Sequence, residues 1–326
     1  MPGSEALALA RYAEVQGTSR AVLEAVQAVW RDVTPDRILS AMQAESGAAI
    51  LRAVTAGQLS VAAGAEAFVA SAMVAQGAAA APLAALSPSG LVGIASDARP
   101  LTTLLYQPAI TTARALALGM SPEAASIAGL NQMALMVSTQ LADTARAANS
   151  VAMTAHPSVT HYVRVVRLPA CARCLILAGR KYSRSKGFAR HPKCDCGMEP
   201  LSPDTDRKPK DPSALVQEMT PAERKRAFGA AGADALEKGA DLSKLVNARR
   251  GVETATVDGK AVKVTREGTT RRGMGELAAD TTFSRSDRSR YWRADTPRLM
   301  PEQILKLAGD DRERQLELLR KHGYIK

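Results

Sequence analysis

The sequence has few aromatic residues. Phe, Trp and Tyr together make up 4% of its 326 residues, whereas hydrophobic residues as a whole make up 46%. This apolar content excludes a wholly disordered chain. The shortage of aromatic rings, with abundant alanine, favours helices that pack closely through small side chains. The length allows two or three domains.

Lysine is missing from the first 180 residues. Residues 1–150 contain eight Arg and no Lys against ten acidic residues, a net charge of −2. The whole chain carries +11, so the remainder carries +13. This step predicts two regions with different surroundings. The basic region can face nucleic acid or an acidic protein surface, and a solvated basic surface is the simpler alternative.

Leader-like and membrane-spanning patterns are not evident. The first residues, MPGSEALALARYAEV, lack the basic segment and the apolar core of a signal peptide. Alanine-rich runs such as GAAAAPLAAL are interrupted by proline and fall short of a membrane span. We therefore expect a soluble protein that is made in a cytoplasm and has no membrane partner.

Common catalytic motifs are also missing. The sequence has no Gly-rich phosphate loop and no Gly-x-Ser-x-Gly elbow. His156 and His161 can in principle serve a nucleophile, but the cysteines are better explained as metal ligands and no serine stands out. We expect no catalytic residue and no enzymatic activity.

The N-terminal half has the apolar periodicity of helices. Apolar residues recur at three- and four-residue steps over 4–33, and Thr34-Pro35-Asp36 is typical of a helix end followed by a new start. Two further runs, from Ile38 to Val54 and from about Val61 to Ala75, indicate more helices. Residues 77–100 are rich in Ala, Pro, Gly and Ser and predict a loop or short helical pieces.

Ser121-Pro122-Glu123 predicts the start of a long helix. Ser121 can cap free backbone N–H groups, Pro122 needs no donor, and Glu123 suits the positive end of the helix. No charge interrupts the helix between Glu123 and Asp143. We expect it to be buried among other helices, with an exposed interaction helix as the alternative.

The C-terminal half has mixed patterns. In HYVRVVRL apolar and polar residues alternate and several residues are β-branched, which predicts a strand. The segment EPLSPDTDRKPKDPS has the composition of a linker. Thr220-Pro221-Ala222-Glu223 is a capping box, and Asp258-Gly259 predicts a hairpin turn. Residues 266–298 are expected to be extended. Two helices, Pro301–Ala308 and Asp311–Lys321, are expected to close the chain, with Gly323 as a helix stop.

All four cysteines lie within 26 residues, in the pattern Cys-x2-Cys-x16-His-x2-Cys-x-Cys. Zn²⁺ takes thiolates and imidazole in a tetrahedron, so five candidates compete for four positions. We take Cys171, Cys174 and Cys194 as ligands and His191 as the fourth, with Cys196 as its rival. The group that is not used would then lie beside the ligands and orient them.

Two other interpretations of the cysteines remain open. They can form two disulfides, which a cytoplasmic protein disfavours, or they can be core cysteines without ligands, which need not cluster with a histidine. A catalytic metal usually keeps one position open for water beside a carboxylate or histidine. We therefore expect a structural zinc ion that stabilises a module too small to fold by apolar burial alone.

Basic residues are concentrated in and after the cysteine segment. Lys181, Arg184, Lys186, Arg190 and Lys193 fall inside it. Several basic stretches follow, and the last, Ser284–Arg293, interleaves arginine with Tyr291 and Trp292, a pattern that can engage phosphates and stack on bases. No nucleic-acid-reading module accompanies them, so protein-facing salt bridges and solvated surface are the stronger interpretation. The candidate partner-binding residues are Arg249, Arg250, Arg271, Arg272, Arg290, Trp292 and Arg293.

The segment ACARCLILAGRKYSRSKGFARHPKCDCGMEP resembles the cysteine-rich core of Mu F-like minor capsid proteins from tailed phages of actinobacteria. GADLSKLVNARRG, REGTTRRG and RLMPEQILKLAGDDRERQLELLRKHGYI resemble the C-terminal portion of the same family. The likeness covers about 160–326 and joins several motifs in order. The helical N-terminal half fits the family only loosely.

The resemblance implies a head morphogenesis protein. Such a protein joins the procapsid in low copy number and associates with the portal protein, the major capsid protein or both. Some relatives are described as capsid maturation proteases, but no catalytic dyad maps onto this chain. A protease is therefore one alternative, and a DNA-binding protein of the virion interior is another. We expect it in several copies in the virion, at the head interior or portal vertex, where packaged DNA is a further possible partner.

These inferences together predict a mainly α protein with three parts. Residues 1–157 form an α-helical domain, and 158–200 form a small zinc-binding α+β module. Residues 201–326 form an extended basic C-terminal region with a linker, a helix, a β-hairpin and two terminal helices. The helical domain is expected to pack against other subunits, and the basic region to lie along portal or capsid surfaces.

Overall fold

The structure is a computed structural model that describes residues 2–188, 191, 194, 196–205, 208–257, 260–267, 282–285, 287 and 291–325. It is mainly helical with small antiparallel sheets, as the sequence predicts. Close packing divides the chain into two compact units. The first comprises residues 1–167 and 179–209, and the second comprises 168–178 and 210–326. Because packing does not show which parts fold independently, the three-domain division stays a prediction.

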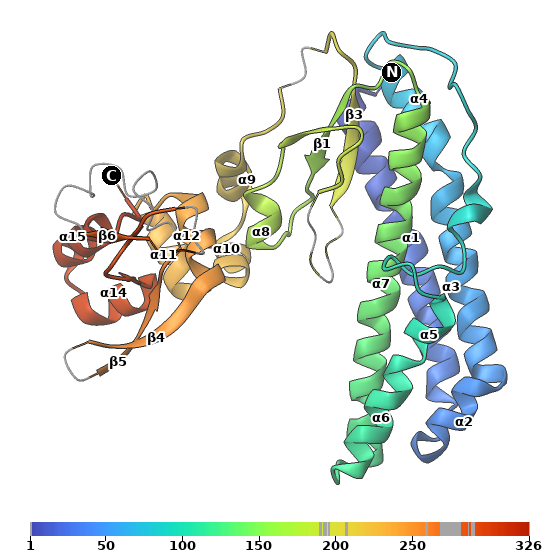
Figure 1. Cartoon of the computed structure of the whole chain (residues 1–326), viewed down its shortest axis with the longest axis horizontal. Coiled ribbons are helices and arrows are strands. Elements are labelled where there is room, and N and C mark those ends of the chain that lie inside the picture. Colours follow the sequence, from blue (N-terminus) through green and yellow to red (C-terminus); the bar gives the residue numbers. More distant parts are fainter. Residues whose placement is uncertain are drawn as a thin grey trace. The chain divides into compact units, whose positions relative to one another are not determined.

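The first unit is built on long helices that lie side by side (Figure 1). Short 3₁₀ turns at Pro35–Arg37 and Pro88–Leu91 interrupt them. The predicted helices over 4–33 and after Ser121 are confirmed, and residues 77–100 are largely irregular, as expected. The helices of this unit are α1 (Ser4–Arg31), α2 (Ile38–Gln43), α3 (Glu45–Ala63), α4 (Ala65–Val74), α5 (Leu101–Leu105), α6 (Gln107–Ala117) and α7 (Pro122–Ala155).

The core of this unit lies where α1, α3 and α7 meet. Trp30, Ile50 and Leu141 are at most 1% exposed and belong to one apolar cluster. The Ser121 side chain caps α7 by accepting a hydrogen bond from the Ala124 N–H at 3.3 Å. Small residues let the helices approach closely, as the alanine-rich composition predicts.

By length and composition alone, the α3–α4 segment, Glu45–Val74, qualifies as a candidate membrane span, with a mean hydropathy of 1.3. Core helices of soluble proteins share these properties. In this fold α3 packs against α1 and α7 and contributes Ile50 and Val54 to the core.

A three-stranded antiparallel sheet completes the first unit. It consists of β1 (His161–Val165), β2 (Lys181–Ser183) and β3 (Gly197–Leu201), in the order β2-β1-β3. The strand predicted from HYVRVVRL is confirmed as β1. The predicted linker begins too early, because its first three residues belong to β3. Gln76 holds this strand through both ends of its amide, which donates to the Pro200 carbonyl at 2.8 Å and accepts from the Ser202 N–H at 3.1 Å.

The second unit has short helices and a small sheet. Its helices are α8 (Ala172–Leu175), α9 (Pro212–Glu218), α10 (Pro221–Phe228), α11 (Ala230–Glu237), α12 (Leu242–Ala248), α14 (Pro301–Ala308) and α15 (Arg312–Lys321). Its strands are β4 (Val252–Val257), β5 (Lys260–Thr265), β6 (Phe283–Ser284), β7 (Arg293–Ala294) and β8 (Arg298–Leu299), with sheets ordered β4-β5-β8 and β6-β7.

The predicted features of this unit are present where the structure describes them. Thr220 and Glu223 form the reciprocal capping box of α10, and β4 pairs with β5 as a hairpin. The Asp258-Gly259 turn lies outside the described residues. Both terminal helices are found, and Gly323 has φ +69°, which suits a helix stop. Helices α9, α11 and α12 were not expected, because their apolar faces are only one or two turns long.

Candidate metal centre

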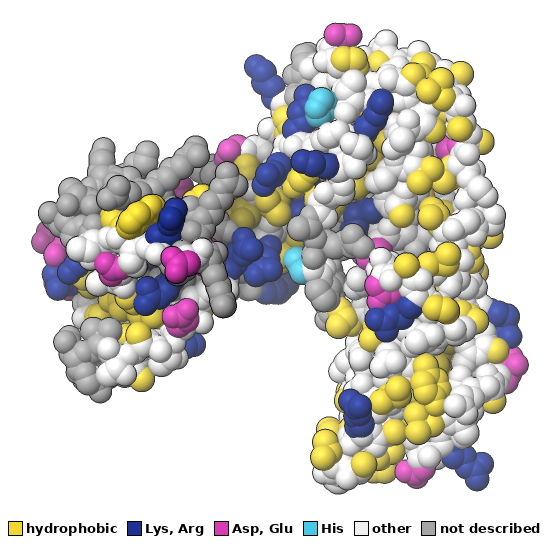
Figure 2. Space-filling model, viewed as in Figure 1, with side chains coloured by type: hydrophobic (Ala, Val, Ile, Leu, Met, Phe, Trp, Pro, Cys, Tyr) yellow, Lys and Arg dark blue, Asp and Glu magenta, His cyan; other side chains and the backbone are white. Residues whose placement is uncertain are grey.

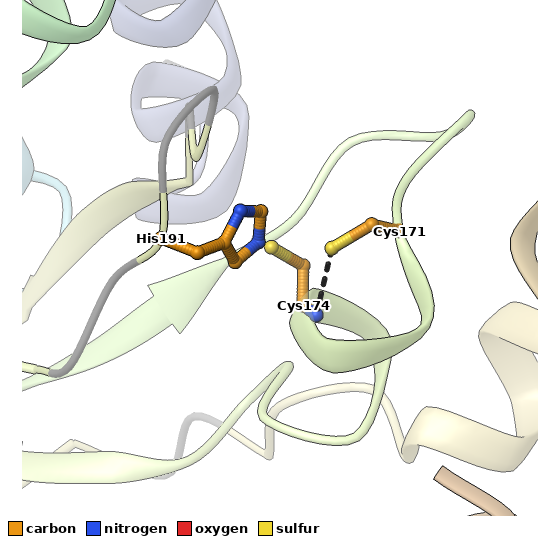
Figure 3. Close-up of side chains that lie close together, drawn as sticks. All are labelled: Cys171, Cys174 and His191. Carbon is orange, nitrogen blue, oxygen red and sulfur yellow. Dashed lines mark hydrogen bonds between the residues drawn. The ribbon is translucent and has the colours of Figure 1, made fainter. Parts of the chain in front are cut away.

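Helix α8 positions the first cysteine pair. Cys171 is the N-cap of this helix, and its sulfur accepts a hydrogen bond from the Cys174 N–H at 3.4 Å (Figure 3). Residues three apart in a helix are neighbours on one face, so both thiols are presented on the same side of α8. The short spacing in the sequence is therefore realised as a knuckle that presents two thiols together.

The second group of donors precedes β3. The Cys194 N–H donates a hydrogen bond to the His191 carbonyl at 2.9 Å, which links these two residues. Cys196 follows, and its successor Gly197 begins the strand. Cys174, Cys194 and Cys196 are all buried.

The five predicted donors converge in two overlapping groups. The donor atoms of Cys171, Cys174 and His191 lie within 4.8 Å of one another, and so do those of Cys174, Cys194 and Cys196. Figure 3 shows the imidazole of His191 and the sulfur of Cys174 pointing toward each other, with the sulfur of Cys171 beside them. Cys174 is therefore common to both groups.

This arrangement fits a metal ion. Two sulfurs bound to one zinc at ~2.3 Å in a tetrahedron lie about 3.8 Å apart, which is within the observed limit. Four thiols and an imidazole are soft and borderline donors, a chemistry that suits zinc and other thiophilic metals better than magnesium or calcium. The cysteine cluster can therefore hold a metal ion, and its donors alone do not fix the identity of the metal.

The Arg164 side chain lies against two of the sulfurs. Its Nη2 donates to the Cys194 sulfur at 3.3 Å and to the Cys196 sulfur at 3.5 Å, and the residue is 2% exposed. A buried guanidinium requires negative charge nearby, and hydrogen bonding to sulfur favours the thiolate, which is the form that binds metal. The guanidinium also lies 4.3 Å from the centre of the Phe188 ring.

The backbone of the same two cysteines is held from α7. Arg146 Nη1 donates to the Cys194 carbonyl at 3.0 Å and to the Cys196 carbonyl at 3.1 Å. Its other terminal nitrogen pairs with Asp143, one turn earlier on the helix. This buried ion pair fixes the backbone of the second donor group, as residues behind a metal site commonly do.

An aromatic cluster closes the sheet side of the site. The rings of Tyr162 and Tyr182, which are direct cross-strand neighbours, stack at 5.4 Å, and Phe188 lies 5.7 Å from Tyr182. Burial raises the pKa of Tyr162 to about 12, so its hydroxyl stays protonated and donates to the Lys186 carbonyl. The cluster therefore holds Lys186 and Phe188 against the sheet.

Sequence reasoning identified the donors but not their supports. The alternation of HYVRV does place Arg164 on the same face as Tyr162, because residues two apart share a face of a strand. Arg146 and Asp143 gave no signal, since they lie about 50 residues before the cysteines they hold.

The predicted partner-binding residues are only partly described. Arg271, Arg272 and Arg290 lie outside the described residues. Arg249 donates to the Phe228 carbonyl at 2.5 Å and lies 3.3 Å from Glu302, so part of its role is structural. Arg293 donates to the Arg266 carbonyl at 2.9 Å. Arg250 is exposed and Trp292 is 50% exposed. Their role in binding a partner stays a prediction.

Comparison with known proteins gives one match. The family model described as VG15 protein matches residues 4–222, which is more than half of the chain. The chain belongs to the VG15 family. The match includes the helices of the first unit, the sheet and all five candidate metal donors. VG15 membership implies a phage-encoded protein and suggests one that is associated with the virion. No curated protein and no solved structure matches the chain.

Proposed function

We propose that this VG15 protein is a structural minor capsid protein of a tailed phage, which joins the head beside the portal or inner capsid during procapsid assembly. The observation that carries the proposal is the VG15 match over residues 4–222. The resemblance to Mu F-like proteins covers about 160–326. The two likenesses overlap at the cysteine segment, and both are to phage proteins.

The helical unit has a surface that suits assembly. Leu118 is 85% exposed, Ile127 is 58% exposed and Met120 is 44% exposed, and all three lie on or near the turn that joins α6 to α7. Figure 2 shows hydrophobic side chains gathered over the end of the helical bundle where α6 lies. Exposed apolar side chains that gather in this way are typical of surfaces that contact other subunits. Such a surface supports a protein that works in several copies within a larger particle.

The metal centre supports a structural rather than a catalytic role. Five thiol and imidazole donors exceed the four positions of a tetrahedral ion, so the donor set can fill the shell with protein ligands and leave no position for water. The metal that we assign is zinc, which four of the five donors would hold. No step of catalysis is assigned to it, and we propose that the protein is not an enzyme.

The test is a survey of intact particles. Procapsids and mature virions from the encoding phage would be analysed by quantitative mass spectrometry and cryo-electron microscopy. We expect the chain in both, at a fixed copy number per particle and next to the portal or the inner capsid wall. Zinc should accompany it at one ion per chain.

A matched pair of variants sharpens this test. Cys171→Ser with Cys174→Ser removes two of the five donors and should abolish incorporation. Ser183→Ala with Ser185→Ala alters the same module without touching the donors and should leave incorporation unchanged. Absence of the wild-type chain from particles would refute the proposal. Cleavage of capsid or scaffold protein that one point mutation abolishes would support a maturation protease instead.

A further inference from the structure

The middle of the chain carries an unusual excess of positive charge. Residues 144–194 contain ten Lys and Arg and no Asp or Glu. Four of these cations fall within seven residues, Arg180, Lys181, Arg184 and Lys186, which we call the basic strand. Like charges this close repel one another, and a bound anion would offset that repulsion.

The basic strand surrounds an edge strand of the sheet: Lys181 belongs to β2, Arg180 precedes it, and Arg184 and Lys186 follow it. β2 is an outer strand in the order β2-β1-β3, and it pairs only with β1 among the described residues. Arg180, Lys181 and Lys186 are exposed, and Arg184 is half-buried. Figure 2 shows Lys and Arg side chains gathered over the part of the molecule where β1 lies.

The charges of the basic strand are not neutralised within the described part of the chain. No described carboxylate lies within ion-pair distance of any of the four. Their recorded contacts are with neutral groups. The Arg184 guanidinium donates to the Val159 carbonyl at 2.7 Å, and the Arg180 guanidinium lies 5.6 Å from the centre of the Tyr182 ring. These contacts orient the cations and leave their charge available to a ligand.

The surroundings of the basic strand distinguish between two acidic partners, a nucleic acid and an acidic protein. Protein interfaces have an apolar centre rich in large side chains, whereas surfaces that bind nucleic acid are polar and strongly positive. Among the described residues from 152 to 205, no large hydrophobic side chain is exposed. The face around β2 therefore offers charge without an apolar anchor, which favours a phosphate backbone over a protein.

We propose that the basic strand binds the phosphate backbone of duplex DNA without reading its sequence. The inference rests on the proposed function in one respect, because a protein inside a phage head faces packaged DNA. It differs from the expectation that the C-terminal arginines carry such contacts. The Tyr182 ring is stacked on Tyr162 and lies near the Arg180 guanidinium.

The test measures binding of the purified, zinc-loaded full-length protein to a fluorescent 30-base-pair duplex over a range of salt concentrations. The variant Arg180→Gln with Lys181→Gln and Lys186→Gln removes three cations. Each phosphate contact contributes about 0.9 to the slope of log K against log salt, so the slope should become shallower by about 2.7. Affinity at low salt should fall at least tenfold, and a duplex of different sequence should bind equally well.

A charge-matched control separates this face from general electrostatics. Arg31→Gln with Arg37→Gln and Arg114→Gln removes three exposed cations from the helical bundle and should leave the salt slope unchanged. Zinc content and the melting temperature verify that each variant is folded. Should the triple variant fail to fold, Lys181→Gln with Lys186→Gln should still make the slope shallower by about 1.8.

Three results would overturn the inference. The first is that the wild-type protein does not bind the duplex. The second is that the bundle control loses as much affinity and salt dependence as the triple variant. The third is that poly-L-glutamate binds more tightly than the duplex at matched charge. The last would indicate an acidic protein partner. Because the assay uses isolated protein, its failure leaves the particle survey untouched, and a negative particle survey leaves the DNA result standing.

Discussion

At the scale of single residues, the candidate metal centre has one donor more than a tetrahedral ion needs. His191 groups with Cys171 and Cys174, whereas Cys196 groups with Cys174 and Cys194. Both Cys194 and Cys196 accept from Arg164, so that contact does not decide between His191 and Cys196 as the fourth ligand. The choice of His191 stays a prediction.

Single substitutions can decide it. We expect His191→Ala to lose stoichiometric zinc. Cys196→Ser should keep one zinc per chain with an affinity about 10- to 100-fold weaker, as for residues that support ligands. Elemental analysis and titration with a competing chelator measure both quantities, and Ser185→Ala serves as the control. The reverse pattern would make Cys196 the fourth ligand, and a wild type without metal would refute the centre.

His322 provides a second prediction at this scale. Burial, with Lys321 and Arg298 nearby, lowers the pKa of His322 to about 4. Its Nδ1 accepts a hydrogen bond from the Leu299 N–H at 3.3 Å, and its carbonyl accepts from Arg298 at 2.6 Å. A protonated ring can no longer accept at Nδ1, so the folded state favours the neutral form.

The unfolded chain binds this proton below about pH 6.5, whereas the folded chain resists it down to about pH 4. Stability is therefore full above pH 6.5 and falls as the pH drops toward 4, by about 3 kcal/mol in total at 1.36 kcal/mol per pKa unit. Urea unfolding at pH 7 and pH 4.5 measures the change. His322→Asn keeps an acceptor without the titration and should lose less stability over this range, and an equal loss would exclude His322 as the cause.

At the scale of elements, two glycines in long helices have opposite surroundings. A Cβ on Gly129 of α7 would lie 2.0 Å from Thr112 Oγ1 and 2.8 Å from both the Pro108 carbonyl oxygen and Trp30 Cζ2. A Cβ on Gly17 of α1 would meet no atom within 4 Å. Gly129 therefore permits the close approach of α6 and α7, whereas Gly17 has no such role.

Alanine substitutions test this difference. Gly17→Ala should stabilise the protein by up to about 1 kcal/mol, because alanine is the better helix former. Gly129→Ala should destabilise it by roughly 1–3 kcal/mol, because the crowding of the α6–α7 contact outweighs that gain. Chemical denaturation of both variants measures the effect, and a Gly129→Ala variant as stable as the wild type would show that the helices separate without cost.

At the scale of the whole molecule, charge and apolar surface lie in different places. The α6–α7 end of the bundle exposes Leu118 and Ile127, whereas the sheet edge exposes Arg180, Lys181 and Lys186. Subunit contacts through the first surface and DNA contacts through the second can therefore be separated by mutation. Particle incorporation should follow the metal centre and the bundle, and the salt dependence of DNA binding should follow the basic strand.

The sequence by itself determined much of the local structure. The caps at Ser121 and Thr220, the alternation before Cys171 and the helical run from residue 4 all depend on near neighbours, and the structure contains each of them. The cysteine spacing likewise predicted which side chains converge, because five soft donors in 26 residues have few other uses. The mainly helical class followed from the same local patterns.

Only the tertiary structure decided what surrounds those features. Arg146 and Asp143 reach the Cys194 backbone from α7, and Arg164 bridges two sulfurs, because folding brings together side chains that spacing does not relate. The predicted linker lost its first residues to β3, since pairing with β1 outweighs a proline-rich composition. Local sequence patterns determine the helices, the strands and the set of candidate ligands. Burial and contacts between distant residues determine which charged side chains are bound within the protein and which remain available to a partner.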